Sequence, residues 1–184
     1  DRVGHRRWIL APDLREVGFG YADGFAALKV FHPGAAAGSS GMSHVAWPPA
    51  GEMPLSLFSV EAAWSFSIDP ALLGGGTKDV RVELTRTRDG RTWRFGGGRS
   101  DGYFAVETSG FGLAYCVIFR PDGVAALRDG DLFLVRIRGL EAAGGGELAV
   151  EYRTLFFNPG PRIAVAVPSR RPAVPTVSFA WETA

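Results

Sequence analysis

Short stretches in which apolar and polar residues alternate run through the second half of the chain. Trp64, Phe66 and Ile68 are separated by serines, and Val80 to Thr85 alternates aliphatic with charged or hydroxyl residues. Successive side chains of a β-strand point to opposite faces of the sheet, so this pattern predicts strands with one buried face. No segment of useful length shows a helical period instead.

Turn sequences separate further segments of this kind. Asp89-Gly90 lies ahead of Trp93 and Phe95 and predicts a hairpin. Further strands are predicted at 103–108, 113–119, 132–138 and 148–157, with Pro121-Asp122-Gly123, Asp129-Gly130 and Gly144-Gly145-Gly146 as turns or loops between them. About seven short strands with frequent turns predict a mainly β fold, an antiparallel Ig-like β-sandwich.

Composition limits the function. With 46% hydrophobic and 21% charged residues the chain has a globular composition, and its net charge of +1 provides no field to attract nucleic acid or an anionic membrane. Only two of the 20 basic residues are lysines, which together with many Gly and Ala suggests a GC-rich bacterial genome. No apolar run is long enough to span a bilayer, so no transmembrane segment is expected.

Cys116 is the only cysteine, so neither an intrachain disulfide nor a cysteine metal cluster can form. It lies in the apolar segment 113–119, which predicts a buried and unreactive thiol.

The N-terminal block has a different pattern. Residues 5–10 are expected to end a helix before Pro12, because the residue preceding a proline disfavours the helical conformation. Two strands, 17–21 and 26–31, are then expected on either side of the turn Ala22-Asp23-Gly24.

This block resembles bacterial members of the CAP superfamily (cysteine-rich secretory proteins, antigen 5 and pathogenesis-related proteins). The resemblance covers residues 2–31 and consists of the Gly4-His5-Arg6 motif, the Ile9-Leu10 step, Pro12 and Val17-Gly18-Phe19-Gly20. It implies the last third of an α-β-α sandwich, secretion, a cleft that takes a divalent metal or a small hydrophobic ligand, and no general catalytic activity. The segments 45–49, 64–67 and 155–159 also resemble a region that follows the CAP part in some bacterial proteins.

Four regions follow from these patterns. We interpret residues 1–33 as the C-terminal fragment of a CAP-like domain, 34–56 as a Gly/Ala/Pro connector, and 57–158 as the β-sandwich. Residues 159–184 are either a Pro-rich tail or linker, or two further short strands at 163–167 and 177–181.

His5 is the candidate metal ligand. The resemblance implies that the histidine of the Gly-His-Arg motif approaches a divalent metal such as zinc, with a second histidine and a glutamate expected upstream. Without these partners, no cofactor is certain, and His5 is expected to hydrogen-bond within the fragment. His32 and His44 are interpreted as surface histidines, because no carboxylate stands at a fixed ligand interval from them.

Three further residues are candidates for ligand binding. Arg6 and Arg7 have the guanidinium groups needed to clamp an anionic group, although ion pairs at the end of a helix are the favoured interpretation. Trp47, beside Pro48-Pro49, offers an aromatic face to a sugar or Pro-rich peptide, although packing on the sandwich is favoured.

The sequence contains no Gly-x-Ser-x-Gly, His-Glu-x-x-His or Walker-type phosphate-binding motif. We therefore expect a non-enzymatic binding or support module. The resemblance to the CAP superfamily implies a location outside the cell or in the cell envelope, and a small hydrophobic or cell-envelope ligand. A CAP-family hydrolase resembling a protease, and an adhesion or scaffold module, are the alternatives.

Residues 17–31 carry many apolar side chains that need to be covered. An upstream CAP segment or a second copy would cover them; otherwise this surface is expected to dock on the sandwich or to be weakly ordered.

Overall fold

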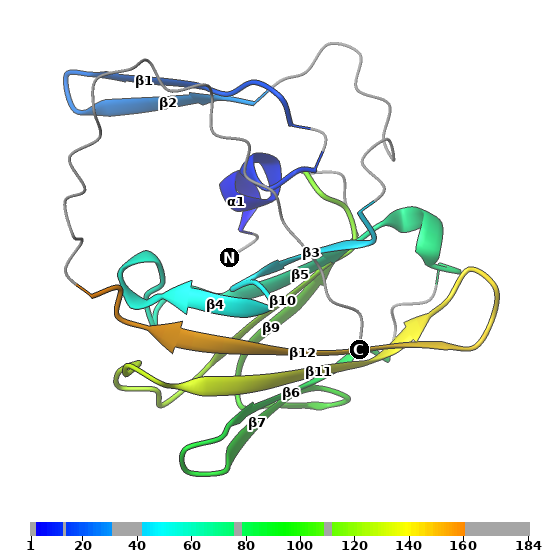
Figure 1. Cartoon of the computed structure of the whole chain (residues 1–184). Coiled ribbons are helices and arrows are strands. Elements are labelled where there is room, and N and C mark those ends of the chain that lie inside the picture. Colours follow the sequence, from blue (N-terminus) through cyan, green and yellow to red (C-terminus); the bar gives the residue numbers. More distant parts are fainter. Residues whose placement is uncertain (1–2, 13, 31–41, 76–78, 109–111, 161–184) are drawn as a thin grey trace, which may run out of the picture.

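Two β-sheets form the body of the molecule in a computed structural model, which describes residues 3–12, 14–30, 42–75, 79–108 and 112–160 (Figure 1). The four-stranded sheet has the order β3 (His44–Trp47), β5 (Trp64–Ile68), β10 (Cys116–Pro121) and β9 (Gly102–Glu107). The six-stranded sheet has the order β4 (Gly51–Pro54), β12 (Glu147–Phe157), β11 (Leu132–Glu141), β6 (Arg81–Arg86), β7 (Arg91–Gly96) and β8 (Arg99–Ser100). The prediction of a mainly β fold with antiparallel sheets is confirmed, with the parallel pair β4–β12 as an exception.

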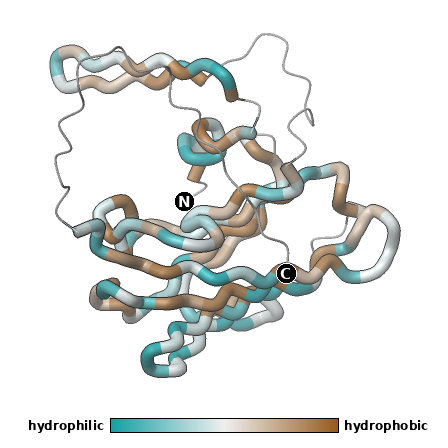
Figure 2. Tube along the Cα trace, viewed as in Figure 1, coloured by the Kyte–Doolittle hydropathy of each residue, from teal (hydrophilic) through white to brown (hydrophobic). Residues whose placement is uncertain are grey.

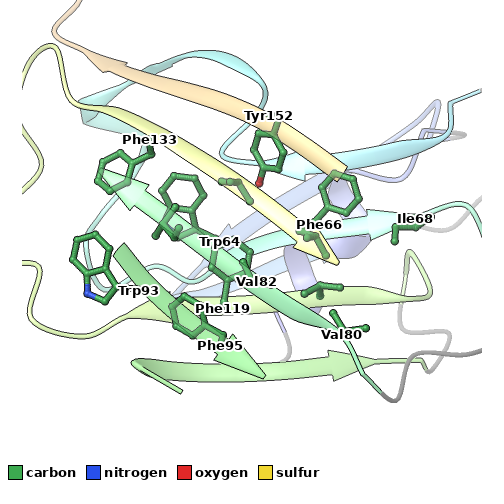
Figure 3. Packing of buried hydrophobic residues seen from close by; sticks show 14 of the residues in the cluster. Trp64, Phe66, Ile68, Val80, Val82, Trp93, Phe95, Phe119, Phe133 and Tyr152 are labelled. Carbon is green, nitrogen blue, oxygen red and sulfur yellow. The ribbon is translucent and has the colours of Figure 1, made fainter. Parts of the chain in front are cut away.

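The inner faces of the two sheets share one hydrophobic core (Figure 3). Trp64 of β5 lies near its centre, with its ring 5.9 Å from that of Phe119 and 5.5 Å from that of Phe133 on the opposite sheet. Each of these three side chains is at most 2% exposed. The alternating pattern of the sequence thus produces a sandwich-like packing, in which apolar residues face inward. In Figure 2, hydrophilic residues gather at the tip of the β6–β7 hairpin.

The connector expected at 34–56 supplies an edge strand to each sheet. β3 pairs with β5, and β4 pairs with β12. Two short 3-10 helices, η1 (Leu55–Leu57) and η2 (Pro70–Leu72), complete the connections at either end of β5.

The strand predicted at 113–119 begins later than expected, at Cys116. Tyr115 has a positive φ of 50°, which does not fit a regular strand. The backbone of Leu113 bonds to the N-terminal helix instead of to a neighbouring strand, since its amide donates to the Arg7 carbonyl at 3.3 Å. The segment 112–115 is therefore a loop that meets the helix.

The N-terminal block forms a short helix and a hairpin. Helix α1 (Gly4–Ile9) ends before Pro12, as predicted, and lies over the outer face of the four-stranded sheet (Figure 1). β1 (Gly18–Ala22) and β2 (Phe25–Lys29) pair around the predicted turn, where Asp23 and Gly24 both have positive φ.

The β1–β2 hairpin stands apart from both sheets (Figure 1). Its aromatic residues Phe19, Tyr21 and Phe25 are 75–79% exposed. Of the two outcomes expected without a cover, docking of this surface on the sandwich is therefore wrong, and weak order stays a prediction. Its covering by a second copy or by an upstream segment stays a prediction.

Some predictions fall outside the described residues, namely His32, the whole Gly/Ala/Ser stretch 34–41, and the two strands proposed at 163–167 and 177–181. In the part of the chain that the structure describes, no helix has the length and apolar character needed to cross a membrane.

Candidate functional site

Helix α1 is held on the four-stranded sheet by a small second core. Val3 packs with Ala63, Cys116 and Ile118, which point away from the main core. The prediction that Cys116 is buried is confirmed, and this burial raises the pKa of its thiol. Because α1 covers this part of the sheet, the polar side chain of Ser65 on β5 is buried as well.

Arg6 joins the helix to the sheet through its guanidinium group. Its Nη1 donates to the Ala63 carbonyl at 2.5 Å and to the Ser65 hydroxyl at 3.2 Å. Burial lowers the pKa of Arg6. These bonds direct the guanidinium toward the sandwich.

Arg7 joins the helix to the loop 112–115. Its side chain is 2% exposed, and its Nε donates to the Leu113 carbonyl at 2.7 Å, while the Leu113 amide donates back to the Arg7 carbonyl. The loop approaches the helix so closely that a Cβ added to Gly112, which has a φ of +73°, would lie 2.6 Å from the Arg7 carbonyl carbon. A glycine is therefore required at this position.

A pocket of about 240 Å³ lies where the N-terminal block meets the four-stranded sheet. Trp8, Ala11 and Pro12 form one wall, and β3, β5 and the loop 112–115 form the other. Its lining is mainly apolar, with Trp8, Met42, Val45, Ile68 and Leu113, and its polar residues are His44, Ser67 and Asp69. Such a site, apolar with few polar groups, suits a small ligand of low polarity.

His44 is the titratable ring in the pocket wall. It stacks on Phe66 with the ring centroids 5.0 Å apart, and its Nδ1 lies 2.9 Å from the Ser43 hydroxyl. Burial lowers the pKa of His44 below its ordinary value of 6.5. The imidazole is therefore neutral at physiological pH, which is compatible with an apolar ligand. The sequence-based interpretation of His44 as a surface histidine did not anticipate this position.

The sequence-predicted candidates do not converge on this pocket. His5 is exposed on α1, and Trp47 is half-buried at the edge of the main core, so neither lines the pocket. Arg6 and Arg7 position the helix that carries Trp8. Among the described residues no group of three or more His, Cys, Asp or Glu side chains is placed to hold a metal. The metal role of His5 stays a prediction.

Sequence reasoning missed Trp8 and His44 as pocket residues. Trp8 directly follows the Gly-His-Arg-Arg run, and this position beside a candidate motif could have pointed to a role in binding. No sequence pattern singled out His44. It lines the pocket because the fold brings Trp8 and Leu113, which are distant in the sequence, to the same site.

We compared the sequence with protein-family models and with curated proteins, and no match was found.

Proposed function

We propose that this chain is a non-enzymatic binding module whose ligand is a small apolar molecule held in the pocket between the N-terminal block and the four-stranded sheet. One observation carries the proposal: both parts of the chain contribute walls to one concave apolar site. Trp8 comes from the CAP-like segment, and Ile68 from the sandwich. The CAP-like fragment and the sandwich would then act as one binding unit.

Several features of the pocket favour an uncharged ligand. The wall residues Trp8, Ile68 and Leu113 present apolar surface, and His44 is held in its neutral form. Burying an unpaired charge against such a surface is costly. An uncharged compound with an apolar ring or chain, and a hydrogen-bonding group toward His44, Ser67 or Asp69, fits this chemistry.

Titration with the neutral fluorescent probe N-phenyl-1-naphthylamine tests this function. We expect saturable binding of one probe per chain. Ala114→Phe, which fills the pocket from its own wall, and Trp8→Ala, which removes the opposite wall, should each weaken binding by about tenfold or more.

Controls separate the pocket from other apolar surfaces. Phe19→Ser changes the exposed hairpin, and Leu57→Ala changes an exposed leucine outside the pocket, so both should bind the probe as the wild type does. Binding that survives Ala114→Phe but is lost in Phe19→Ser would refute the pocket as the binding site.

The same proposal includes membership of the CAP superfamily, an Ig-like form of the sandwich, and a location outside the cell or in the cell envelope. The residues Gly4-His5-Arg6 and Val17-Gly18-Phe19-Gly20 support the first of these. Detection of the native protein in washed cell-envelope or extracellular fractions, with a cytosolic marker absent, tests the location.

An adhesion or scaffold role is the second candidate, and the exposed hairpin favours it. Phe19 and Tyr21, with their cross-strand neighbours Leu28 and Ala26, form an apolar face of a kind that commonly marks contact with a partner. Sedimentation velocity of the wild type and of the combined variant Phe19→Ser and Tyr21→Ser tests whether this hairpin makes such a contact.

A further inference from the structure

The outer face of the six-stranded sheet carries a row of charges that neutralise one another. In register across β7, β6, β11 and β12 lie Arg94, Glu83, Arg136 and Glu151. Arg94 bonds to Glu83 at 2.9 Å, and Arg136 bonds to Glu151 at 2.7 Å. Opposite charges in neighbouring strands stabilise a sheet in this way.

The adjacent row breaks this pattern. Arg81 of β6 and Arg138 of β11 are direct partners in the antiparallel ladder and are both exposed on the outer face. Within the part of the chain that the structure describes, neither guanidinium makes an ion pair or a hydrogen bond. Two like charges directly opposite each other destabilise a ladder. Among the described groups the Glu151 carboxylate also attracts Arg138, but it is bonded to Arg136.

A hollow of about 430 Å³ lies over this pair. Arg81, Arg94, Arg99, Arg136 and Arg138 line it, with Glu83 as its carboxylate. Gly97 keeps one side open, because a Cβ there would lie 3.0 Å from Arg81 Nε. Three of these arginines are paired with carboxylates: Arg94 with Glu83, Arg136 with Glu151, and Arg99 with Asp101. Among the described residues, Arg81 and Arg138 are therefore the two arginines of the hollow that have no bonded carboxylate.

We propose that Arg81 and Arg138 form an anion site that takes a doubly charged phosphate group between their two guanidinium groups. The charges match, since a phosphate monoester carries nearly two negative charges at neutral pH. The chemistry also suits phosphate, because planar guanidinium groups bind phosphate oxygens in pairs and the two arginines are direct cross-strand partners. A singly charged carboxylate would leave one arginine uncompensated. This site lies on the other sheet from the apolar pocket and is independent of it.

Phosphate titration followed by NMR tests the site directly. In a low-salt buffer held at constant ionic strength with chloride, inorganic phosphate should shift the Nε–Hε signals of Arg81 and Arg138 to saturation. Arg138→Gln and Arg81→Gln should each weaken binding by about tenfold. Arg153→Gln removes another exposed arginine from the same sheet, outside the hollow, and should leave binding unchanged.

Thermal unfolding provides a second readout. Phosphate should raise the melting temperature of the wild type but not of Arg138→Gln. Without phosphate, Arg138→Gln should melt no lower than the wild type, because the substitution removes a repulsion. A lower melting point in phosphate-free buffer would overturn the proposed repulsion.

Phenyl phosphate and acetate, tested in the same titration, identify which kind of anion the site binds. Phenyl phosphate that binds at least as tightly as inorganic phosphate assigns the site to a phosphomonoester on a larger molecule, whereas exclusion of phenyl phosphate assigns it to free phosphate. Acetate that gives the same saturable shifts would overturn the requirement for a double charge. If phosphate shifted the Nε–Hε signals of all exposed arginines equally and without saturation, the proposed site would be refuted.

Discussion

Tyr152 shows how a single polar atom affects the core. Its ring stacks on Phe66 with centroids 5.8 Å apart, and its hydroxyl is buried without a hydrogen-bond partner among the residues that the structure describes. Burial raises the pKa of this hydroxyl, so it stays protonated. A buried hydroxyl that loses its bonds to water without gaining protein partners destabilises the folded state by about 1–3 kcal/mol.

We therefore expect Tyr152→Phe to increase the free energy of unfolding by about 1 kcal/mol, because the ring contacts remain and the unpaired hydroxyl is removed. Urea denaturation of both proteins measures this difference. Tyr21→Phe is the control, since Tyr21 is 79% exposed and its hydroxyl is solvated. A loss of stability in Tyr152→Phe would show that the hydroxyl is bonded in solution.

Asp89, in the β6–β7 turn, predicts a dependence of stability on pH. Its carboxylate accepts two bonds from Arg86, at 2.6 and 3.1 Å. These bonds hold the pKa of Asp89 at about 2, below its ordinary value of 3.8. Because the folded state has the lower pKa, ionised Asp89 stabilises the fold above its ordinary pKa, and this contribution disappears as the pH falls to about 2.

Asp89→Asn should therefore be less stable than the wild type at pH above about 4, and the difference should shrink steadily toward about pH 2. Denaturation curves of both proteins across this range measure the difference. Glu52→Gln, which removes an exposed carboxylate from β4, corrects for the change in net charge. A difference that does not change with pH would contradict the argument.

At the scale of elements, the contact between helix α1 and the loop 112–115 depends on Gly112. A side chain there would require a strained backbone at φ +73° and would collide with the Arg7 and Trp8 backbone. Gly112→Ala should therefore displace α1 from the sheet and open the pocket.

We expect Gly112→Ala to lose binding of N-phenyl-1-naphthylamine and to increase hydrogen exchange in residues 4–9. Gly130→Ala is the matched control, because Gly130 has a similar φ of +80° and nothing within 4 Å of the added Cβ. It bears the same backbone strain without the collision. Equal behaviour of the two variants would show that strain alone, and not the helix contact, governs the pocket.

The elements that the sequence predicted well are those with strict alternation. β5 lies at the predicted position, and β11 and β12 include the predicted ranges. β11 and β12 largely alternate buried with more exposed side chains, whereas β5 is buried on both faces and its alternation is one of apolar residues with serines. β3 and β4 were not predicted as strands of the sheets. In β3 all four residues are half-buried and so show no alternation, and β4 follows two prolines.

At the scale of the whole molecule, the pocket could not be predicted from the sequence. It forms because Trp8, His44 and Leu113 meet, and their positions span more than half of the chain. Arg7 donates to the backbone carbonyl of Leu113. Because every residue has such a carbonyl, no side chain in the sequence marked Leu113 as the partner of Arg7. The residue pattern of the N-terminal block correctly predicted its local structure, a short helix and a hairpin. It did not show that the helix packs on the four-stranded sheet.

The β1–β2 hairpin is exposed and stands apart from both sheets. A hairpin of two strands is at best marginally stable alone in water. In β1–β2, Phe19 and Tyr21 share one face, and their cross-strand neighbours Leu28 and Ala26 extend it. Among the described residues, no further strand pairs with the outer edge of either strand. Unpaired edges and exposed aromatic side chains both favour association.

We therefore expect the protein to self-associate as its concentration rises, with the hairpin as the contact. Sedimentation velocity over a wide concentration range measures this association. The combined variant Phe19→Ser and Tyr21→Ser should stay monomeric and keep the melting temperature of the two-sheet core, from which these residues are remote. Leu57→Ser removes an exposed leucine elsewhere and should associate as the wild type does. A wild-type protein that is monomeric at every concentration would leave the hairpin to a different partner and contradict this prediction.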